Sequence, residues 1–575
     1  MALVIPAAIQ TQPPPSRLAD QVAPNAGDSL FVTWTMASEA HALAHHPAQV
    51  FAANIFYPRR DAIAWSDNLL AALPLFAPLD ALAGGRLLVV YNIITLVGFA
   101  GVGGAVYLLA HDLIGRRGPA LIAATLCSLS MARSISVGHT QLAGFLFVVL
   151  AVVALIRFLE HRGWSAAVAF GAAAAATWLV SAYYAVMLVL VLVPFLVVWL
   201  VQRRFRVGRF FWPGVGLAAA VAIPLVAPTL GPYIRLQRAG LFTRSASAVP
   251  GTAWSELWRV PPSLLYRAIS GVGSLAHYDK AGLFPGLVLT GLVLALLAGL
   301  LVARFDKSAA PAPTRAARWL WPLVASCLPC LLLMVGPHAR FGLSAGYVAL
   351  RAAVPGVASL RQLDRFWMWP LCCLCLAAGA GAERILFNFR PPVRVAMAVT
   401  LLAVIWAELL FRPPLVTVDL STRTTAANHA LARLPAGPVF ELPEPLGPTF
   451  AYVDAARQLR SLIDRNPRVD GYSGNLPPAV DQIERLATRL DPAALVPLMR
   501  RYGVRYLVLH GAPRPCSAGY SPSELAAITA SLQGMDGVER LFPAGEDVIV
   551  VLAPATIDRT LPAAGPGGIR PAACT

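Results

Sequence analysis

The stretch YAVMLVLVLVPFLVVWLV, residues 184–201, contains no charged side chain and is long enough to cross a lipid bilayer as a helix. Similar stretches recur along the chain, since 57% of its 575 residues are hydrophobic and only 13% are charged. We expect about ten spans within residues 87–411, at 87–110, 118–132, 141–158, 165–182, 184–201, 210–230, 283–303, 318–336, 366–383 and 394–411. The sequence therefore predicts a mainly α-helical, polytopic transmembrane bundle.

Basic side chains gather in alternate connections between these spans. The five clusters are HDLIGRR (111–117), EHR (160–162), QRRFRVGR (202–209), RFDKSAAPAPTRAAR (304–318) and ERILFNFRPPVR (383–394). Because positive charge favours cytoplasmic loops, we expect these clusters to face the cytoplasm. The other polar segments then lie on the outer side, and they are residues 11–86, the turn at 133–141, and residues 231–282, 337–365 and 412–575.

The net charge of +17 has the same explanation, because cytoplasmic loops and anionic lipid headgroups account for excess arginine in a membrane protein. We find no RNA- or DNA-binding motif, so the expected partner is the lipid bilayer and not a nucleic acid. Cysteines within the apolar spans behave as small hydrophobic residues. The sequence therefore predicts no metal site and no cofactor.

Residues 1–86 form an N-terminal segment and a first outer loop. The start, MALVIPAAI, has the composition of the end of an apolar span, and we expect a preceding span to be missing. The segment GDSLFVTW, residues 27–34, is expected to begin an interfacial amphipathic helix, with Leu30, Phe31 and Trp34 toward lipid.

The last part of the chain, residues 412–575, has the pattern of a small extracytoplasmic α/β domain with a loose tail. Short β-rich runs, GPVFELP, YGVRYLVLHG and EDVIVVLAP, alternate with segments of helical apolar spacing. No glycine-rich nucleotide motif or nucleophile elbow occurs in it. Cys516 and Cys574 are the pair available for a disulfide here, and the sequence leaves open whether the tail brings them together.

Asp28 is the candidate catalytic residue. It follows Gly27 at the start of the expected first-loop helix, where a carboxylate can cap the first turn or act as a base at the membrane surface. Asp67, within WSDNLL of the same loop, has the same two interpretations and is a candidate substrate-binding residue.

Other candidate substrate-binding residues lie at outer ends of the spans. His139 and Gln141 form a GHTQ turn, and the pair Tyr183 and Tyr184 closes another turn, where tyrosines ordinarily serve as interfacial anchors. Outer arginines are unexpected on this side, and the first of them are Arg235, Arg238 and Arg244. Guanidinium groups bind phosphate in a bidentate manner, so these residues indicate a phosphate-bearing lipid or donor, with ordinary headgroup contacts as the alternative.

Several of these motifs together resemble a known family. They are GDSLFVTW, ANIFYPRRDAIAWSDNLL, GHTQL, SAYYAV, PYIRLQRAGLFTRS, LFPGLVL, VPGVASLRQLDRFWMWPL, NPRVDGYSG and YGVRYLVLHG. The chain resembles bacterial multispanning membrane proteins related to the C-type (GT-C) glycosyltransferase superfamily. The resemblance implies an inner-membrane enzyme with an acidic base in the first outer loop, matched in position by Asp28, and a sugar donor carried on a polyprenyl phosphate.

The sequence also departs from the superfamily pattern. Many members carry an acidic pair where Asp28 stands between Gly27 and Ser29, and relatives have a histidine where this chain has Asn68. The superfamily normally has an initial span before this loop, in agreement with a missing span here.

The expected reaction is an inverting, metal-independent displacement at the anomeric carbon. A glycan, lipid or protein hydroxyl is the acceptor, a carboxylate takes its proton, and cationic groups stabilise the departing lipid phosphate. The alternative is a non-catalytic role on the same fold, as an envelope glycan assembly factor or a flippase or transporter of lipid-linked glycans. Transporters generally show internal repeats or midplane charges, which the sequence does not show.

Overall fold

The computed structural model describes residues 3–561 except 24, 135–138, 162, 247–248, 250, 261–262, 271–282, 306–314, 339–341, 413, 421–424, 446–449 and 512–518. The chain divides into two compact units. Unit 1 comprises Met1–Ser16, Leu70–Ala72 and Asn92–Leu415, and unit 2 comprises Arg17–Leu69, Leu73–Tyr91 and Val416–Thr575. The predicted division at 1–86, 87–411 and 412–575 differs from this grouping, because most of the first outer loop forms one compact unit with the C-terminal residues.

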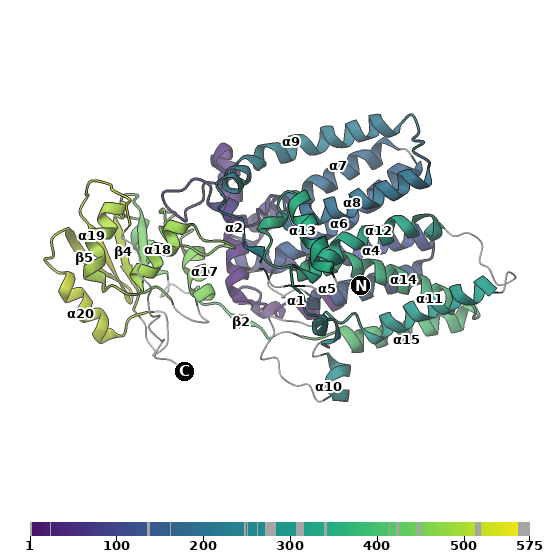
Figure 1. Ribbon diagram of the computed structural model, residues 1–575. Helices are drawn as coiled ribbons and strands as arrows, with labels where there is room; N and C mark the ends of the chain where they lie inside the picture. The colour runs from purple at the N-terminus through teal and green to yellow at the C-terminus, as the bar shows by residue number, and fades with distance from the viewer. Residues whose placement is uncertain are drawn as a thin grey trace. The chain divides into compact units, whose positions relative to one another are not determined.

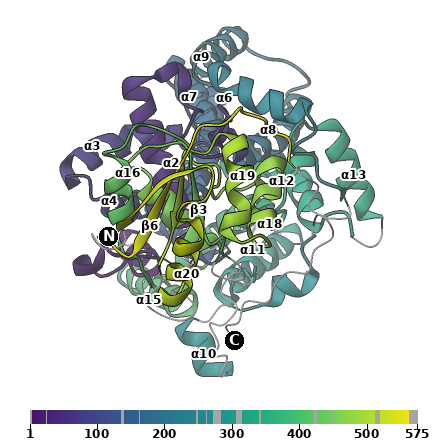
Figure 2. The ribbon, with the colours of Figure 1, turned by 90° about the vertical axis from the view of Figure 1, so that its left-hand side faces the viewer.

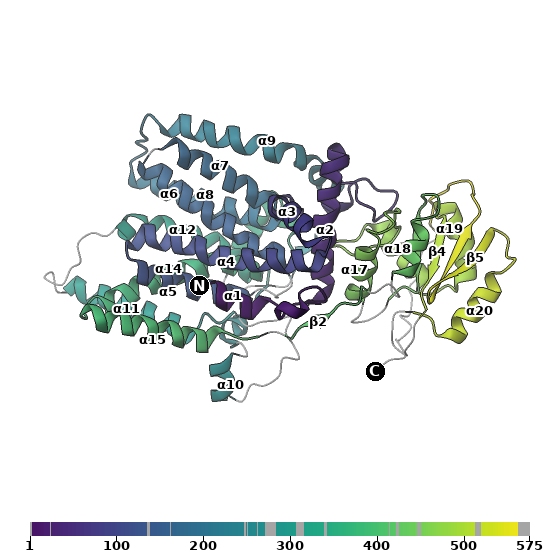
Figure 3. The same ribbon diagram turned by 180° about the vertical axis from the view of Figure 1, so that it is seen from behind.

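Unit 1 consists mostly of long apolar helices that run alongside one another (Figures 1 and 3). They are α4 (Leu87–Ile114, whose first residues group with unit 2), α5 (Arg117–Ser134), α6 (Phe145–His161), α7 (Trp164–Trp178), α8 (Ala182–Gln202), α9 (Phe211–Arg238), α11 (Leu287–Phe305), α12 (Arg315–Val335), α14 (Met368–Leu386) and α15 (Pro391–Leu409). The shorter helices of this unit are α1 (Val4–Thr11), α10 (Leu264–Ser270) and α13 (Leu343–Ala353). Each predicted span coincides with one of these helices.

Six helical segments of the described chain are long and apolar enough to cross a membrane. They are α4, α8, α9, α12, α15 and the segment Asp364–Leu386, which contains α14. The protein is therefore a multi-pass membrane protein, and the expected number of about ten spans stays a prediction.

Small residues and charged pairs hold the helices of unit 1 together. A Cβ atom at Gly381 of α14 would lie 2.1 Å from the carbonyl oxygen of Leu292 in α11, so glycine is required for this close approach. At the ends that we expect to face the cytoplasm, Arg157 Nε donates to Asp112 Oδ2 at 2.6 Å and joins α6 to α4. These contacts hold neighbouring helices of unit 1 together.

Unit 2 contains a four-stranded sheet with helices on both faces (Figure 2). Its strands are β3 (Val439–Leu442), β4 (Tyr506–Leu509), β5 (Val538–Ala544) and β6 (Asp547–Leu552), in the order β3-β4-β6-β5. Strands β3 and β4 are parallel and the other pairs are antiparallel. One face packs on α18 (Pro478–Ala487), α19 (Pro492–Tyr502) and α20 (Pro522–Leu532), and the other on α16 (Ala426–Leu431). Cys516 and Cys574 lie outside the described residues.

The first outer loop of unit 2 packs on the C-terminal part of the chain. Helix α2 (Ala26–His45) lies against α17 (Phe450–Arg460), and the loop continues into α3 (Leu73–Ala83). Strand β1 (Gln21–Val22) pairs with β2 (Val416–Thr417) in antiparallel fashion. The short 3-10 helices of both units are Pro15–Arg17, Pro47–Gln49, Ala62–Trp65, Leu70–Ala72, Thr140–Gly144, Trp254–Trp258, Val357–Ser359 and Asp364–Trp367.

The expectation that Leu30, Phe31 and Trp34 face lipid is wrong. Leu30 and Trp34 are fully buried, and Phe31 packs edge-on against Tyr472 with ring centroids 5.7 Å apart. These side chains face protein because α17, more than 400 residues later in the chain, covers α2.

Candidate functional site

Asp28 lies in the first turn of α2, half-buried. The residue at the N-cap position is Asn25, which adopts a left-handed conformation with φ 67°, and Asp28 follows it within the first turn. The Asp28 carboxylate accepts side-chain hydrogen bonds from Asn25 Nδ2 to Oδ2 at 2.5 Å and from Tyr472 Oη to Oδ1 at 2.9 Å. A negative charge in a first turn is also favoured by the helix dipole.

Gly27, the residue before Asp28, lies against the backbone of α17. A Cβ atom here would lie 2.7 Å from the carbonyl oxygen of Ala451. That space is filled by the backbone of α17. Gly27 therefore permits α2 and α17 to approach, and it does not open a path to Asp28.

Tyr472 is the partner of Asp28 that the sequence interpretation missed. It belongs to NPRVDGYSG, residues 466–474, a motif that contributed to the resemblance but had no assigned role. The Tyr472 backbone N–H donates to Gln458 Oε1 of α17 at 2.7 Å, and the side chain reaches Asp28. Only the three-dimensional contact between segments 444 residues apart identifies this pair.

The same motif anchors a buried ionic network at the end of β3. Arg468, with 2% of its side chain exposed, donates from Nε to Glu441 at 2.8 Å and from Nη2 to Asp464 at 2.7 Å. His510 Nε2 lies 2.8 Å from the other oxygen of Glu441, and its Nδ1 lies 3.2 Å from Asp547. Burial opposes ionisation of Glu441, but Arg468 and His510 outweigh burial and lower its pKa.

Several carboxyl groups near this network have raised pKa values. Burial raises the pKa of Asp470 to about 7 and that of Asp454 to about 7, and it raises the pKa of Glu484 to about 9. On α2, burial raises the pKa of Glu39 to about 8, although the backbone N–H of Leu69 donates to its carboxylate. Perturbed carboxyl groups of this kind gather at functional sites more often than elsewhere, so unit 2 holds the strongest candidates in the described chain.

The predicted substrate-binding tyrosines lie in unit 1, in the first turn of α8. The backbone N–H groups of Arg361 and Gln362 donate to Tyr183 Oη at 2.8 and 3.2 Å, and the Arg365 guanidinium lies 4.7 Å from the centre of its ring. Tyr183 therefore holds an arginine-rich part of the loop 337–365. Tyr184 is fully buried and its hydroxyl contacts Met368 Sδ at 3.4 Å, so it packs in the bundle.

The remaining predicted residues divide between the units. Arg235 and Arg238 are exposed at the end of α9, and the Arg244 N–H donates to the Ala358 carbonyl at 3.1 Å. His139 is half-buried, and Gln141 is buried with no hydrogen-bond partner for Oε1 among the described residues. Asp67 is half-buried in unit 2, as is Asp28.

No group of three or more His, Cys, Asp or Glu side chains in the described part of the chain is placed to hold a metal ion.

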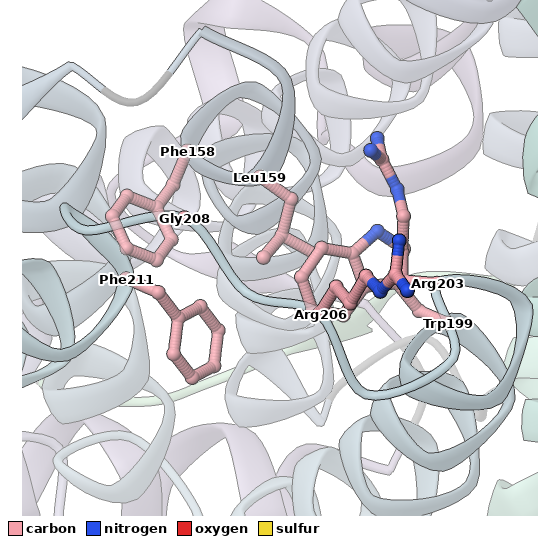
Figure 4. A pocket seen from close by; sticks show the side chains of 7 residues that line it. All are labelled: Phe158, Leu159, Trp199, Arg203, Arg206, Gly208 and Phe211. Atoms are coloured by element: carbon pink, nitrogen blue, oxygen red, sulfur yellow. The ribbon is translucent and has the colours of Figure 1, made fainter.

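In unit 1, a pocket at the connection between α8 and α9 is lined by Phe158, Leu159, Trp199, Arg203, Arg206, Gly208 and Phe211 (Figure 4). This connection is one of the basic clusters expected to face the cytoplasm, where arginines beside aromatic rings suit contact with lipid headgroups.

No protein-family model and no curated protein matches the sequence. Several solved structures do match. One is the arabinofuranosyltransferase AftD from mycobacteria, at 17% identity and TM-score 0.49, over 92% of this chain and 40% of that chain. An oligosaccharyltransferase from Archaeoglobus fulgidus matches at 12% identity and TM-score 0.47, over 88% of this chain and 69% of that chain. ArnT from Cupriavidus metallidurans matches at 12% identity and TM-score 0.40, over 97% of both chains.

At 12–17% identity and TM-scores below 0.5, these likenesses show no family for this chain, and its relation to the GT-C superfamily stays a prediction from the sequence. This chain spans only 40% of the length of the mycobacterial protein. Likeness at this level concerns the path of the chain and not the donor, the acceptor or the residues that act.

Proposed function

We propose that this protein is a membrane glycosyltransferase that transfers a sugar from a polyprenyl-phosphate-linked donor to an extracytoplasmic acceptor. The observation that carries the proposal is the carboxylate of Asp28, half-buried in a helical first turn and oriented by Tyr472 and Asn25.

In the proposed reaction the acceptor oxygen attacks the anomeric carbon of the donor sugar and inverts it. The new glycosidic bond forms as the bond from the anomeric carbon to the phosphate oxygen breaks, and the acceptor proton moves to Asp28. The leaving group is the polyprenyl phosphate, whose developing charge requires cationic partners. No metal is needed for these steps.

The candidate phosphate-binding residues are the outer arginines of unit 1. Arg235 and Arg238 present exposed guanidinium groups, and Arg244 is half-buried beside the loop 337–365. We assign substrate binding to Asp67, His139, Gln141 and Tyr183 as part of the same proposal, and we leave out Tyr184 because it is fully buried. The proposal also places residues 412–575 outside the bacterial inner membrane.

The test is sugar transfer by the purified full-length protein in lipid nanodiscs, with polyprenyl-phosphate sugars as donors. We expect Asp28→Asn to lower transfer by about a hundred-fold or more, and Asp67→Asn, the matched control in the same loop, to lower it less. Transfer by Asp28→Asn at the wild-type rate would contradict the assignment and favour a non-catalytic assembly role.

The donor side has its own test. Arg235→Gln, Arg238→Gln and Arg244→Gln should each weaken binding of a polyprenyl phosphate more than Arg204→Gln does, because Arg204 lies in a predicted cytoplasmic cluster. Equal effects of all four substitutions would mean that these arginines only touch headgroups.

A further inference from the structure

A second polar pocket lies in unit 2 beside the motif that carries Tyr472. It is lined by Ile55, Glu441, Asp454, Arg457, Gln458, Arg468, Asp470 and Gly471. Three of these residues project from α17, and three come from NPRVDGYSG. The sequence alone indicates no function for the residues that line this pocket.

Two atoms of α17 that line this pocket lack partners. Asp454 Oδ2 and Gln458 Nε2 are buried and make no hydrogen bond to any described residue. Only 7% of the surface of Asp454 and 3% of that of Gln458 is exposed. The orientation of the Gln458 amide is fixed, because its Oε1 accepts the Tyr472 N–H at 2.7 Å. Leaving a buried donor and a buried acceptor unpaired is costly, which indicates that a ligand or ordered water satisfies them.

The charges around the pocket exclude strongly ionic ligands. Arg457 and Arg468 oppose a cation, while Glu441, Asp454 and Asp470 oppose an anion such as a phosphate. Burial raises the pKa of Asp454 and that of Asp470 to about 7, so neither provides a full negative charge at neutral pH. A neutral polar ligand therefore fits this lining best.

We propose that this pocket binds hydroxyl groups on one edge of a carbohydrate, with Asp454 accepting from one hydroxyl and Gln458 donating to the same or the neighbouring one. A hydroxyl both donates and accepts, which matches the one free acceptor and one free donor. These residues lie one helical turn apart on the same face of α17. The enclosed part of the pocket has room for about one water-sized group, and therefore for hydroxyls and not for a whole sugar.

The pocket is connected to the proposed base through two hydrogen bonds. Gln458 holds the backbone of Tyr472, whose hydroxyl donates to Asp28. The carbohydrate is then the acceptor, and this role alone rests on the proposed function. Carbohydrate binding by itself does not depend on transfer.

Binding is tested with the full-length protein in nanodiscs, by saturation-transfer NMR with methyl glycosides of common hexoses and pentoses. Per-O-methylated glycosides, which cannot donate hydrogen bonds, are the control ligands. The variant is Asp454→Leu, which replaces the acceptor by an apolar side chain of similar size. The control variant is Asp481→Asn on α18, where the Asp481 side chain is 44% exposed.

We expect at least one glycoside to bind the wild type, Asp454→Leu to weaken this binding about ten-fold or more, and Asp481→Asn to leave it unchanged. Binding is measured without any sugar donor, so failure of the transferase assignment leaves this result intact. Equal binding of the per-O-methylated glycoside, unchanged binding by Asp454→Leu, or no binding by the wild type would each overturn the proposal. The ligand comparison uses wild-type protein, so the proposal can be refuted even if Asp454→Leu does not fold.

Discussion

Replacing Glu39 by glutamine should remove one distinct part of the pH dependence of the stability of unit 2. Glu39 is fully buried in α2, and the Leu69 N–H lies 3.3 and 3.2 Å from its two carboxylate oxygens. Burial outweighs this hydrogen bond and raises its pKa from 4.5 to about 8. The folded protein therefore holds a proton on Glu39 that the unfolded chain releases.

The sign and size of the effect follow from this shift. A raised carboxyl pKa gives stability that is fully present below pH 4.5 and is lost as pH rises toward about 8. At about 1.4 kcal/mol for each pH unit, the loss is about 5 kcal/mol over this window and about 2.5 kcal/mol between pH 5 and 7. Glutamine does not titrate, so Glu39→Gln lacks this contribution.

Thermal unfolding of the purified protein, followed by tryptophan fluorescence at several pH values, measures the effect. For a unit of about 230 residues, the Tm of Glu39→Gln relative to the wild type should rise by about 5 to 10 °C between pH 5 and 7. The exposed carboxyl variant Asp481→Asn is the matched control, with no such rise expected. Parallel pH profiles of Glu39→Gln and the wild type would refute the reasoning.

Three further predictions concern packing, the ionic network and topology. Gly27→Ala should destabilise unit 2 by about 1 to 3 kcal/mol, because the new methyl group meets the backbone of Ala451, and an unchanged Tm would contradict this close packing. Arg468→Met should cost about 3 to 5 kcal/mol by leaving Glu441 buried without its guanidinium partner, and the double variant with Glu441→Leu should recover part of the loss in the same unfolding assay. A cysteine at Ser523, in a background without native cysteines, should react with an impermeant maleimide from the outer side; labelling only from the cytoplasm would invert the topology.

The membrane helices could be predicted because each one is marked by a continuous apolar run in the sequence. A run such as residues 184–201 is apolar throughout, and each predicted span lies within or overlaps a helix of the structure. The strand runs at β3, β4 and β6 were recognisable for the same reason, since they are short and rich in β-branched residues. Strand β5 was not expected, because its sequence VERLFPA contains two charged residues and a proline.

Only Asp28 itself could be predicted at the candidate site, because the residues that contact it lie far away in the sequence. Asp28 could be chosen from its place beside a glycine before an aromatic helix. Its partner Tyr472, the covering helix α17 and the filled space at Gly27 follow from packing of segments more than 400 residues apart. A single sequence shows the motif NPRVDGYSG but not which side chain of it reaches α2.

The most direct test of the central claim is the single-turnover rate of sugar transfer with Asp28→Asn at saturating donor and acceptor. The loss must be chemical, so the variant should keep the wild-type Tm, because asparagine can still accept from Tyr472 through its side-chain oxygen. The predicted result is a rate at least about a hundred-fold below that of the wild type, with Tyr472→Phe less affected because it only orients the carboxylate. An Asp28→Asn protein that folds normally and transfers sugar at the wild-type rate would contradict the account.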